Sequence, residues 1–358
     1  MEKDTILKIR DLSISFRTHA GIVKAVRGVN YEVRRGETVA IVGESGCGKS
    51  VTVKAVMGIS SGNEIVENGS IEFTYTQEDG SRKTVDILSL SRQEMQKIIK
   101  GQRIAMVFQD PMTSLDPTMT IGNQIIEGMV LHKHMSRSAA WQKAIDLLRQ
   151  VGIEQPENRM KNYPHQLSGG MRQRVCIAIA LACEPELLIC DEPTTALDVT
   201  IQAKILELLL DIQKKTNISI IFITHDLGVV AKVADYVNVM YAGKIVETGM
   251  AEDIFYDPRH PYTWGLLLSM PDVNTDDDRL YTIPGAPPNL LYPIKGDAFA
   301  PRNKYALNID FEQEPPMMEI NEHHQAATWL LAPEAPKIGV PDELKRKIEK
   351  LSVRSNQW

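Results

Sequence analysis

Residues 38–50 read TVAIVGESGCGKS, a short apolar run followed by a glycine-rich turn that ends in Lys-Ser. The turn matches the pattern G-x-x-x-x-G-K-[ST]. It follows a predicted buried strand, Thr38–Val42, and opens a predicted helix that continues to about Met57. Glycines let main-chain N–H groups converge on phosphate oxygens, and the start of a helix adds positive potential. The stretch therefore predicts a phosphate-binding loop at residues 43–50.

The residues of this loop are expected to have separate roles in ligand binding. Lys49 is expected to reach the β- and γ-phosphates of a nucleotide, and the Ser50 hydroxyl to ligate Mg²⁺. The full set of predicted nucleotide ligands in and directly after the loop is Gly43, Ser45, Gly46, Cys47, Gly48, Lys49, Ser50 and Val51.

A second apolar strand, Leu187–Cys190, ends in the carboxylates Asp191 and Glu192. Consecutive side chains at a strand end diverge, so the two acids can do different work. Asp191 is suited to hold a metal ion and Glu192 to polarise an attacking water. An acidic pair at a strand end is commonly just solvated, but beside a complete phosphate loop the catalytic interpretation is favoured.

Composition sets wider bounds on the function. The chain has 358 residues, 43% of them hydrophobic and 24% charged, which is ordinary globular usage and argues against a disordered chain. Its formal charge of −6 argues against a general nucleic-acid binder, which needs a basic surface. Four cysteines occur without metal-ligand spacing, so we expect buried, reduced thiols at Cys47, Cys176, Cys183 and Cys190.

Neither a signal peptide nor a membrane-spanning helix is expected. Charged residues are spread through the first 16 residues, where a signal peptide would carry an uninterrupted apolar stretch. The longest apolar run, Val175–Cys183, is about nine residues long, roughly half of what a spanning helix needs.

The hydrophobic periodicity predicts an α/β fold. Alternating apolar residues over 4–41 and 69–75 predict antiparallel strands, whereas 111–184 has helical spacing. Within that helical stretch, Ser138 is expected to cap a helix that ends before Gly152.

Further along, the apolar runs Leu187–Cys190 and Ile218–Thr224 flank an amphipathic helix. This order is typical of a covered parallel sheet. After about residue 250 the composition changes: an acidic link, Asp272–Asp278, precedes a segment, 284–341, that holds ten of the 19 prolines. We expect a separate C-terminal extension there.

Together these motifs resemble the nucleotide-binding subunits of ABC transporters. The stretch Leu167-Ser168-Gly169-Gly170-Met171 matches the family signature, which closes on ATP held by the opposite subunit. The other matching positions, in chain order, are the adenine-stacking aromatic Phe16, the Q-loop Gln109, the D-loop Ala196-Leu197-Asp198 and the switch histidine His225. Taken singly, each residue has a structural interpretation, but their joint order over some 200 residues favours the family.

The resemblance implies both a fold and a site. The fold is a P-loop ABC nucleotide-binding domain with a RecA-like parallel-sheet core, an antiparallel β subdomain and a helical subdomain, followed by a C-terminal extension. The implied bounds are 1–265 for the domain, about 111–184 for its helical part and 266–358 for the extension. ATP and Mg²⁺ are the implied ligands. The implied roles are Mg²⁺ binding for Ser50, Gln109 and Asp191, and catalysis for Glu192, His225 and Gln109.

Four further stretches narrow the resemblance to the oligopeptide and dipeptide permease ATPases, particularly the D-type subunit. They are FQDPMTSLDP at 108–117, YAGK at 241–244, DPRHPYT at 257–263 and IPGAPP at 283–288. The resemblance implies an ATPase at the cytoplasmic face of the membrane that powers peptide import. Its implied partners are a second ATPase subunit, two transmembrane permease subunits that dock near residues 109–135, and, indirectly, an extracytoplasmic peptide-binding protein.

One departure from that family concerns its extension. Many relatives carry four cysteines there that resemble an iron–sulfur site, but this chain has Asp297, Asn303, Asp310 and Thr328 at those positions. Without thiolates such a cluster cannot be held, so we predict none. The His323-His324 pair is expected to be packed or solvated rather than metal-binding. The aromatic residues of the extension favour a packed element over a passive tail; they are Tyr281, Tyr292, Phe299, Tyr305, Phe311 and Trp329.

Two alternative functions stay open at this point. The first is an importer ATPase for another small solute, such as nickel, because fold-level analogy does not settle the cargo. The second is a soluble ABC-type switch that acts on nucleic acid or ribosomes. The single cassette, the net negative charge and the lack of heptads argue against this second alternative.

Overall fold

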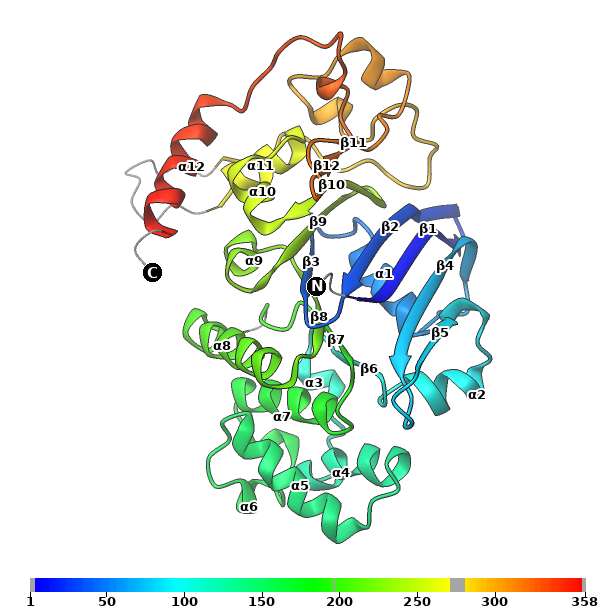
Figure 1. Cartoon of the computed structure of the whole chain (residues 1–358), viewed down its shortest axis with the longest axis vertical. Helices are drawn as coiled ribbons and strands as arrows, with labels where there is room; N and C mark the ends of the chain where they lie inside the picture. The colour runs from blue at the N-terminus through cyan, green and yellow to red at the C-terminus, as the bar shows by residue number, and fades with distance from the viewer. Residues whose placement is uncertain (1–3, 196, 271–280, 356–358) are drawn as a thin grey trace.

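The computed structural model describes residues 4–195, 197–270 and 281–355, which form two β-sheets with helices packed around them (Figure 1). The larger sheet consists of β3 (Thr38–Val42), β6 (Ile104–Val107), β7 (Leu187–Asp191), β8 (Ser219–Thr224), β9 (Tyr236–Tyr241), β10 (Lys244–Met250), β11 (Met318–Glu319) and β12 (Gln325–Ala326). Its strand order is β11-β12-β10-β9-β3-β8-β7-β6. Neighbouring strands from β9 to β6 are parallel.

The centre of this sheet is apolar on both faces. Every residue of β3, β7 and β8 is buried, as expected for parallel strands that helices cover on both sides. The predicted strand–helix–strand unit with a covered parallel sheet is therefore confirmed. In the register, Val42 lies beside Thr224, and Asp191 lies beside Ile223. The phosphate loop, the acidic pair and His225 thus leave the sheet at the same edge.

The N-terminal strands form the second sheet, which is antiparallel. Its order is β2-β1-β4-β5, made of β1 (Thr5–Thr18), β2 (Gly21–Arg34), β4 (Glu64–Thr76) and β5 (Arg82–Asp86). The apolar side chains of β1 and β2 pack against β3 and against α1 (Lys49–Val56), the helix that follows the phosphate loop. This confirms the predicted antiparallel region and the helix that ends near Met57.

The segment predicted to be helical is helical, and it forms one end of the molecule (Figure 1). It contains α3 (Pro111–Ser114), α4 (Ile121–His132), α5 (Arg137–Gln150), α6 (Pro156–Arg159) and α7 (Gly169–Leu181). The predicted cap of α5 is wrong: the Ser136 hydroxyl accepts from the Ala139 N–H, so Ser138 lies inside the first turn. Both serines precede the same apolar pattern, which does not distinguish them. Gly152, just past the helix, has a φ of 73°, as a C-terminal glycine should.

The C-terminal extension is built onto the larger sheet. Strand β12 pairs with β10, and β11 pairs with β12, so the sheet continues into residues 318–326. Helices α10 (Ala251–Tyr256), α11 (Pro261–Leu268) and α12 (Asp342–Ser355) lie at this end of the molecule (Figure 1). The bounds 1–265 and 266–358 stay a prediction, and the acidic link Asp272–Asp278 lies outside the described residues.

The aromatic residues of the extension pack only in part. Phe299 is buried in a cluster with Tyr241 and Tyr262, and Tyr281 and Tyr305 pack against the same cluster. Tyr292 and Phe311 are mostly exposed, so the expectation of a packed element is wrong for these two.

Further helices and short turns connect the strands. Helix α8 (Val199–Thr216) connects β7 to β8, α9 (Leu227–Val233) connects β8 to β9, and α2 (Arg92–Glu94) precedes β6. Short 3₁₀ turns lie at Ile87–Ser89, Pro164–Gln166, Ala300–Arg302, Asn308–Phe311 and Trp329–Leu331, and a π-helical turn lies at Met95–Ile99. Within the described ranges, we find no helix with the length and apolar character that crossing a membrane requires.

Candidate nucleotide site

The phosphate loop connects β3 to α1, and its backbone admits only glycine at two places. Gly43 has a φ of 150°, and a Cβ there would lie 2.0 Å from the Met240 carbonyl oxygen. Gly48 has a φ of 109°, and its Cβ would lie 2.6 Å from the Ala25 carbonyl oxygen. These glycines let the chain turn tightly between the strand and the start of the helix, as a loop that encloses phosphate must.

The lysine of the loop lies folded against its own backbone. Lys49 is 5% exposed, and its Nζ donates to the carbonyl oxygens of Gly43 at 2.7 Å and Glu44 at 3.1 Å. Among the described residues, we find no ion pair of Lys49. A buried ammonium group that contacts only neutral acceptors is suited to an anionic ligand.

The next residue of the loop contacts the first of the two acids. The Ser50 hydroxyl donates to Asp191 Oδ1 at 2.9 Å across the edge of the sheet. Burial is the main influence on Asp191 and raises the pKa of its carboxyl, while the hydrogen bond from Ser50 opposes that rise. A hydroxyl and a carboxylate held together beside a phosphate loop are the oxygen ligands that Mg²⁺ accepts, so the residues present fit the predicted metal.

The second acid is the focus of a polar cluster. Glu192 Oε2 accepts from Gln109 Nε2 at 3.2 Å and from Thr195 Oγ1 at 2.9 Å, and it lies 3.4 Å from His225 Nδ1. The structure therefore brings together the three predicted catalytic residues. Thr195 was not predicted: it lies three residues after Glu192 in a turn, and nothing in the sequence marks its hydroxyl as pointing back.

The signature residues lie at another corner of the same chain. The Ser168 hydroxyl accepts from the Met171 N–H and caps α7, and Asp198 caps α8 in the same way through the Ile201 N–H. A Cβ on Gly170 would lie 2.8 Å from the Ile201 side chain, so this corner packs against the start of α8. The predicted D-loop residue Ala196 lies outside the described residues.

The predicted adenine contact, Phe16, is partly buried near the end of β1. It pairs with Val23 and Glu64 on the neighbouring strands and packs against the core below the antiparallel sheet. In the loop itself Ser45 and Gly46 are exposed. The role of Phe16 stays a prediction.

The four residues that we aligned with the expected cysteine positions make local hydrogen bonds. Each accepts a main-chain N–H from a residue within three positions, over 3.0, 2.9, 2.6 and 3.3 Å respectively, at Asp297, Asn303, Asp310 and Thr328. The neighbouring His324 is fully buried and lies 2.8 Å from a Glu247 oxygen, as expected for a packed histidine. In the described part of the chain, we find no cluster of three or more His, Cys, Asp or Glu side chains able to hold a metal. All four cysteines are buried and free, as predicted.

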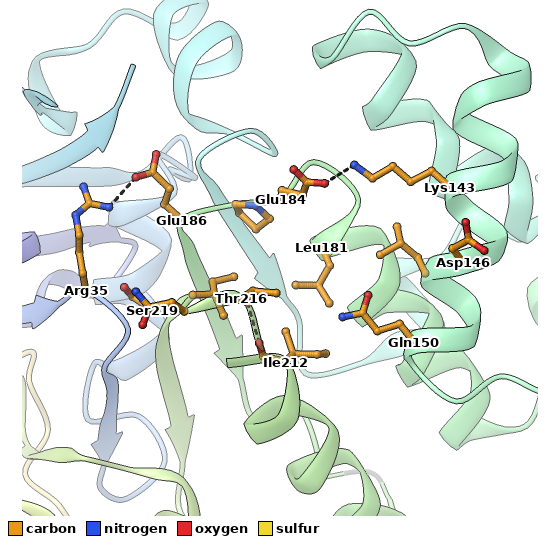
Figure 2. Close-up of a pocket in the computed structure, with 14 residues that line it drawn as sticks. Arg35, Lys143, Asp146, Gln150, Leu181, Glu184, Glu186, Ile212, Thr216 and Ser219 are labelled. Atoms are coloured by element: carbon orange, nitrogen blue, oxygen red, sulfur yellow. Dashed lines mark hydrogen bonds and ion pairs between the residues drawn. The ribbon is translucent and has the colours of Figure 1, made fainter. Parts of the chain in front are cut away.

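A cavity of about 640 Å³ lies elsewhere, between the helical segment and the N-terminal ends of β7 and β8 (Figure 2). Figure 2 shows the Arg35–Glu186 pair on one side of it and the Lys143–Glu184 pair on the other. None of the predicted site residues lines this cavity, so it is separate from the candidate nucleotide site.

The fold and the site together define an ATP-binding cassette of the ABC type. The family model for ABC transporters matches residues 26–195, and the model for the oligopeptide/dipeptide transporter C-terminal region matches residues 246–309. The oligopeptide transport ATP-binding protein OppD of Bacillus subtilis (strain 168) is 56% identical over 97% of this chain and 95% of its own length. The chain belongs to the ABC transporter family and, within it, to the oligopeptide and dipeptide transport ATP-binding proteins.

Other comparisons agree with this assignment. The dipeptide transport ATP-binding protein DppD of Lactococcus lactis subsp. cremoris (strain MG1363) is 55% identical over 96% of both chains. The structure resembles the post-hydrolysis dimer of the ATP-binding cassette MJ0796 bound to ADP and Pi, with a TM-score of 0.59 and 25% identity over 69% of this chain and 99% of that one. It also resembles cbiO1 of Clostridium perfringens, part of the transporter complex cbiONQ, with a TM-score of 0.58 and 32% identity over 71% and 92% of the two chains.

Proposed function

We propose that this chain hydrolyses ATP to energise the import of oligopeptides, as one subunit of a multisubunit ABC importer. The observation that carries this proposal is the match of residues 246–309 to the oligopeptide/dipeptide C-terminal region, in addition to the cassette. The description of that model names oligopeptide and dipeptide transporters. The relatives that match nearly the whole chain are likewise named for oligopeptide or dipeptide transport.

In the proposed site, the residues of the loop hold the nucleotide. Lys49 exchanges its two carbonyl acceptors for the β- and γ-phosphates, and the main-chain N–H groups of the loop cradle the same oxygens. Phe16 stacks on the adenine. Ser50, Asp191 and Gln109 hold Mg²⁺, which when bound neutralises charge on the phosphates.

Hydrolysis depends on the cluster around Glu192. Its carboxylate orients the attacking water and accepts a proton from it. Gln109 and Thr195 fix the direction of this carboxylate by donating to the same oxygen, and His225 lies on that side within 3.4 Å. The cluster is thus oriented before the nucleotide arrives.

A second cassette completes the site. In this chain Ser168 and Gly169 are exposed, so the corner that the signature forms is accessible to a facing subunit. We propose that it covers the ATP held by that subunit, which is either a paralogous F-type chain or a second copy of this chain. Asp198 and the largely exposed Val199 would lie along the same interface.

Two transmembrane permease subunits dock beside Gln109. Exposed apolar side chains occur on both sides of this residue in the sequence, since Phe108 is 40% exposed and Met112 62%. Leu131, on α4 within the predicted docking stretch 109–135, is 64% exposed. Such side chains suit a partner helix laid in a groove. This docking holds the chain at the cytoplasmic face of the membrane. The peptide-binding protein lies on the other side of the membrane and acts on this chain only indirectly, through the permease subunits.

The alternative cargoes and the nucleic-acid switch receive no support from the relatives, which are named for peptides. The test is to co-express the chain with its permease partners and a second ATPase subunit, and to measure ATP turnover of the assembled complex in vesicles. ATP turnover that rises with a loaded peptide-binding protein supports the proposal. Turnover that responds to Ni²⁺ or to RNA and not to peptide would overturn it.

A further inference from the structure

A residue of the C-terminal extension contacts the phosphate loop directly. Arg302 donates to both carboxylate oxygens of Glu44, from Nη1 to Oε2 at 2.6 Å and from Nη2 to Oε1 at 2.9 Å. Glu44 is the second residue of the loop, 258 positions earlier in the chain. The contact is a paired arrangement in which two parallel N–H groups meet one carboxylate, which fixes orientation as well as charge.

Glu44 is held at its main chain as well. Its N–H donates to the Tyr262 hydroxyl at 2.8 Å, and its carbonyl accepts from Lys49 at 3.1 Å. Both Tyr262 and Arg302 lie in the stretch that matches the oligopeptide/dipeptide C-terminal region. The region matched by that model thus contacts the main chain of Glu44 through Tyr262 and its side chain through Arg302.

The guanidinium group is itself fixed in place. The Arg302 side chain is 5% exposed, and its Nε donates to the Pro284 carbonyl at 2.8 Å. Its Nη1 also lies 3.2 Å from the Tyr241 hydroxyl, and the rings of Tyr241 and Phe299 lie within 6 Å of its charge. Because these contacts hold the arginine rigidly, they define the position of the loop end that it binds.

The charge of Glu44 makes this contact matter for the ligand. An unpaired carboxylate beside the loop repels the phosphates of a nucleotide, and the Glu44 side chain is 27% exposed, so solvent screens it only partly. Arg302 cancels that charge and holds the carboxylate against the extension. The structure shows no other cation in an ion pair with Glu44 among the described residues.

We propose that Arg302 is a positioning residue for nucleotide binding: the extension uses it to neutralise Glu44 and to keep the phosphate loop in its binding conformation. This inference rests on the proposed nucleotide site at residues 43–50. It gives the extension a direct part in ATP binding that the cassette alone does not supply. A loop that spends less time in the binding conformation binds with a proportionally weaker apparent affinity.

The test measures the Kd of Mg²⁺-ADP for the purified full chain by isothermal titration calorimetry. Arg302→Met is expected to weaken binding about tenfold, the size of effect expected when a charge-assisted contact is lost. Lys304→Ala is the matched control. Lys304 is exposed and lies two positions after Arg302, so this variant loses the same charge without losing the contact and should leave the Kd unchanged. The double variant Glu44→Gln/Arg302→Met should recover most of the lost affinity, since it removes the exposed carboxylate.

If Arg302 only stabilised the fold, also replacing Glu44 would not restore the affinity. Recovery of the affinity in the double variant therefore distinguishes neutralisation of Glu44 from a merely structural role. An Arg302→Met Kd equal to wild type, or a double variant no better than the single, would overturn the inference. Should Arg302→Met not fold, Arg302→Lys keeps the charge without the paired geometry and is expected to bind Mg²⁺-ADP more weakly than wild type. An unchanged Kd in Arg302→Lys would then overturn the positioning role. A wild-type chain that binds no ADP would instead contradict the proposed function itself.

Discussion

The side-chain amide of Gln109 donates a hydrogen bond of 3.2 Å to the carboxylate of Glu192, across 83 residues of sequence. The two residues leave adjacent parallel strands, β6 and β7, at the same edge of the sheet. The loop at which we propose that the permease docks and the proposed water-orienting acid therefore contact each other directly. A shift of Gln109 when a partner docks would change the direction of the carboxylate on which hydrolysis depends.

Replacing Glu192 by glutamine should leave nucleotide binding intact while lowering ATP turnover on the order of a hundredfold or more, because the amide cannot accept the proton. The measurement is steady-state ATPase activity of the assembled transporter, with Mg²⁺-ATP binding measured in parallel. Glu207→Gln makes the same change at an exposed position of α8 and should retain full turnover. Retained turnover in Glu192→Gln would assign the base to another group.

Replacing Lys49 by alanine should act on binding instead. The variant loses the buried ammonium group that lies against Gly43 and Glu44, so Mg²⁺-ATP affinity is expected to fall at least about tenfold. The Kd is measured on the isolated chain by calorimetry. Lys204→Ala, on the exposed face of α8, is the control and should bind as wild type does. Equal affinities for Lys49→Ala and wild type would remove the loop from the nucleotide site.

Much of this architecture follows from the sequence because its determinants are local. The buried strand at 38–42, the glycine turn and the helix behind it are consecutive, and so are the strand at 187–190 and its two acids. The shared edge of the sheet then follows from parallel pairing. The cap of α5 was misplaced by two residues because Ser136 and Ser138 offer the same chemistry before the same apolar pattern.

What the sequence did not predict depends on contacts between distant segments. The hydrogen bond from Thr195 to Glu192 depends on the shape of one turn, and Glu192 itself has a φ of 47°. The pairing of Arg302 with Glu44 requires the extension to fold back onto the phosphate loop after β3. No periodicity or local motif in either segment encodes that return.

Introducing a charge at the proposed permease surface should weaken assembly. Met112 is 62% exposed beside the Q-loop, and Met112→Glu places a carboxylate where a partner helix would bury it. We expect co-purification with the permease subunits to fall at least about tenfold. Val66→Glu, at a 44% exposed valine of β4, is the matched control and should assemble normally. Unimpaired assembly of Met112→Glu in a folded chain would place the docking surface elsewhere.

Asp297 makes the stability of the extension depend on pH. Burial is the main cause that raises the pKa of its carboxyl to about 6, and the nearby acid Asp310 adds to the rise. The folded state thus retains a proton that the unfolded state loses. Ionising the buried Asp297 carboxyl therefore lowers the free energy of unfolding. This loss of stability is absent below the usual carboxyl range, grows as the pH rises from about 4, and is complete above about 6.

Asp297→Asn should therefore raise the melting temperature at pH 7.5, where it removes a cost of at most about 3 kcal/mol, and raise it about half as much at pH 5. An asparagine oxygen can still accept the Phe299 N–H, so the local turn is kept. Thermal unfolding followed by circular dichroism at both pH values makes the comparison. Asp211→Asn, at an exposed position, should change neither value. A destabilised Asp297→Asn at pH 7.5 would mean that the ionised carboxylate is favourable in the fold, and that its pKa lies below the usual range.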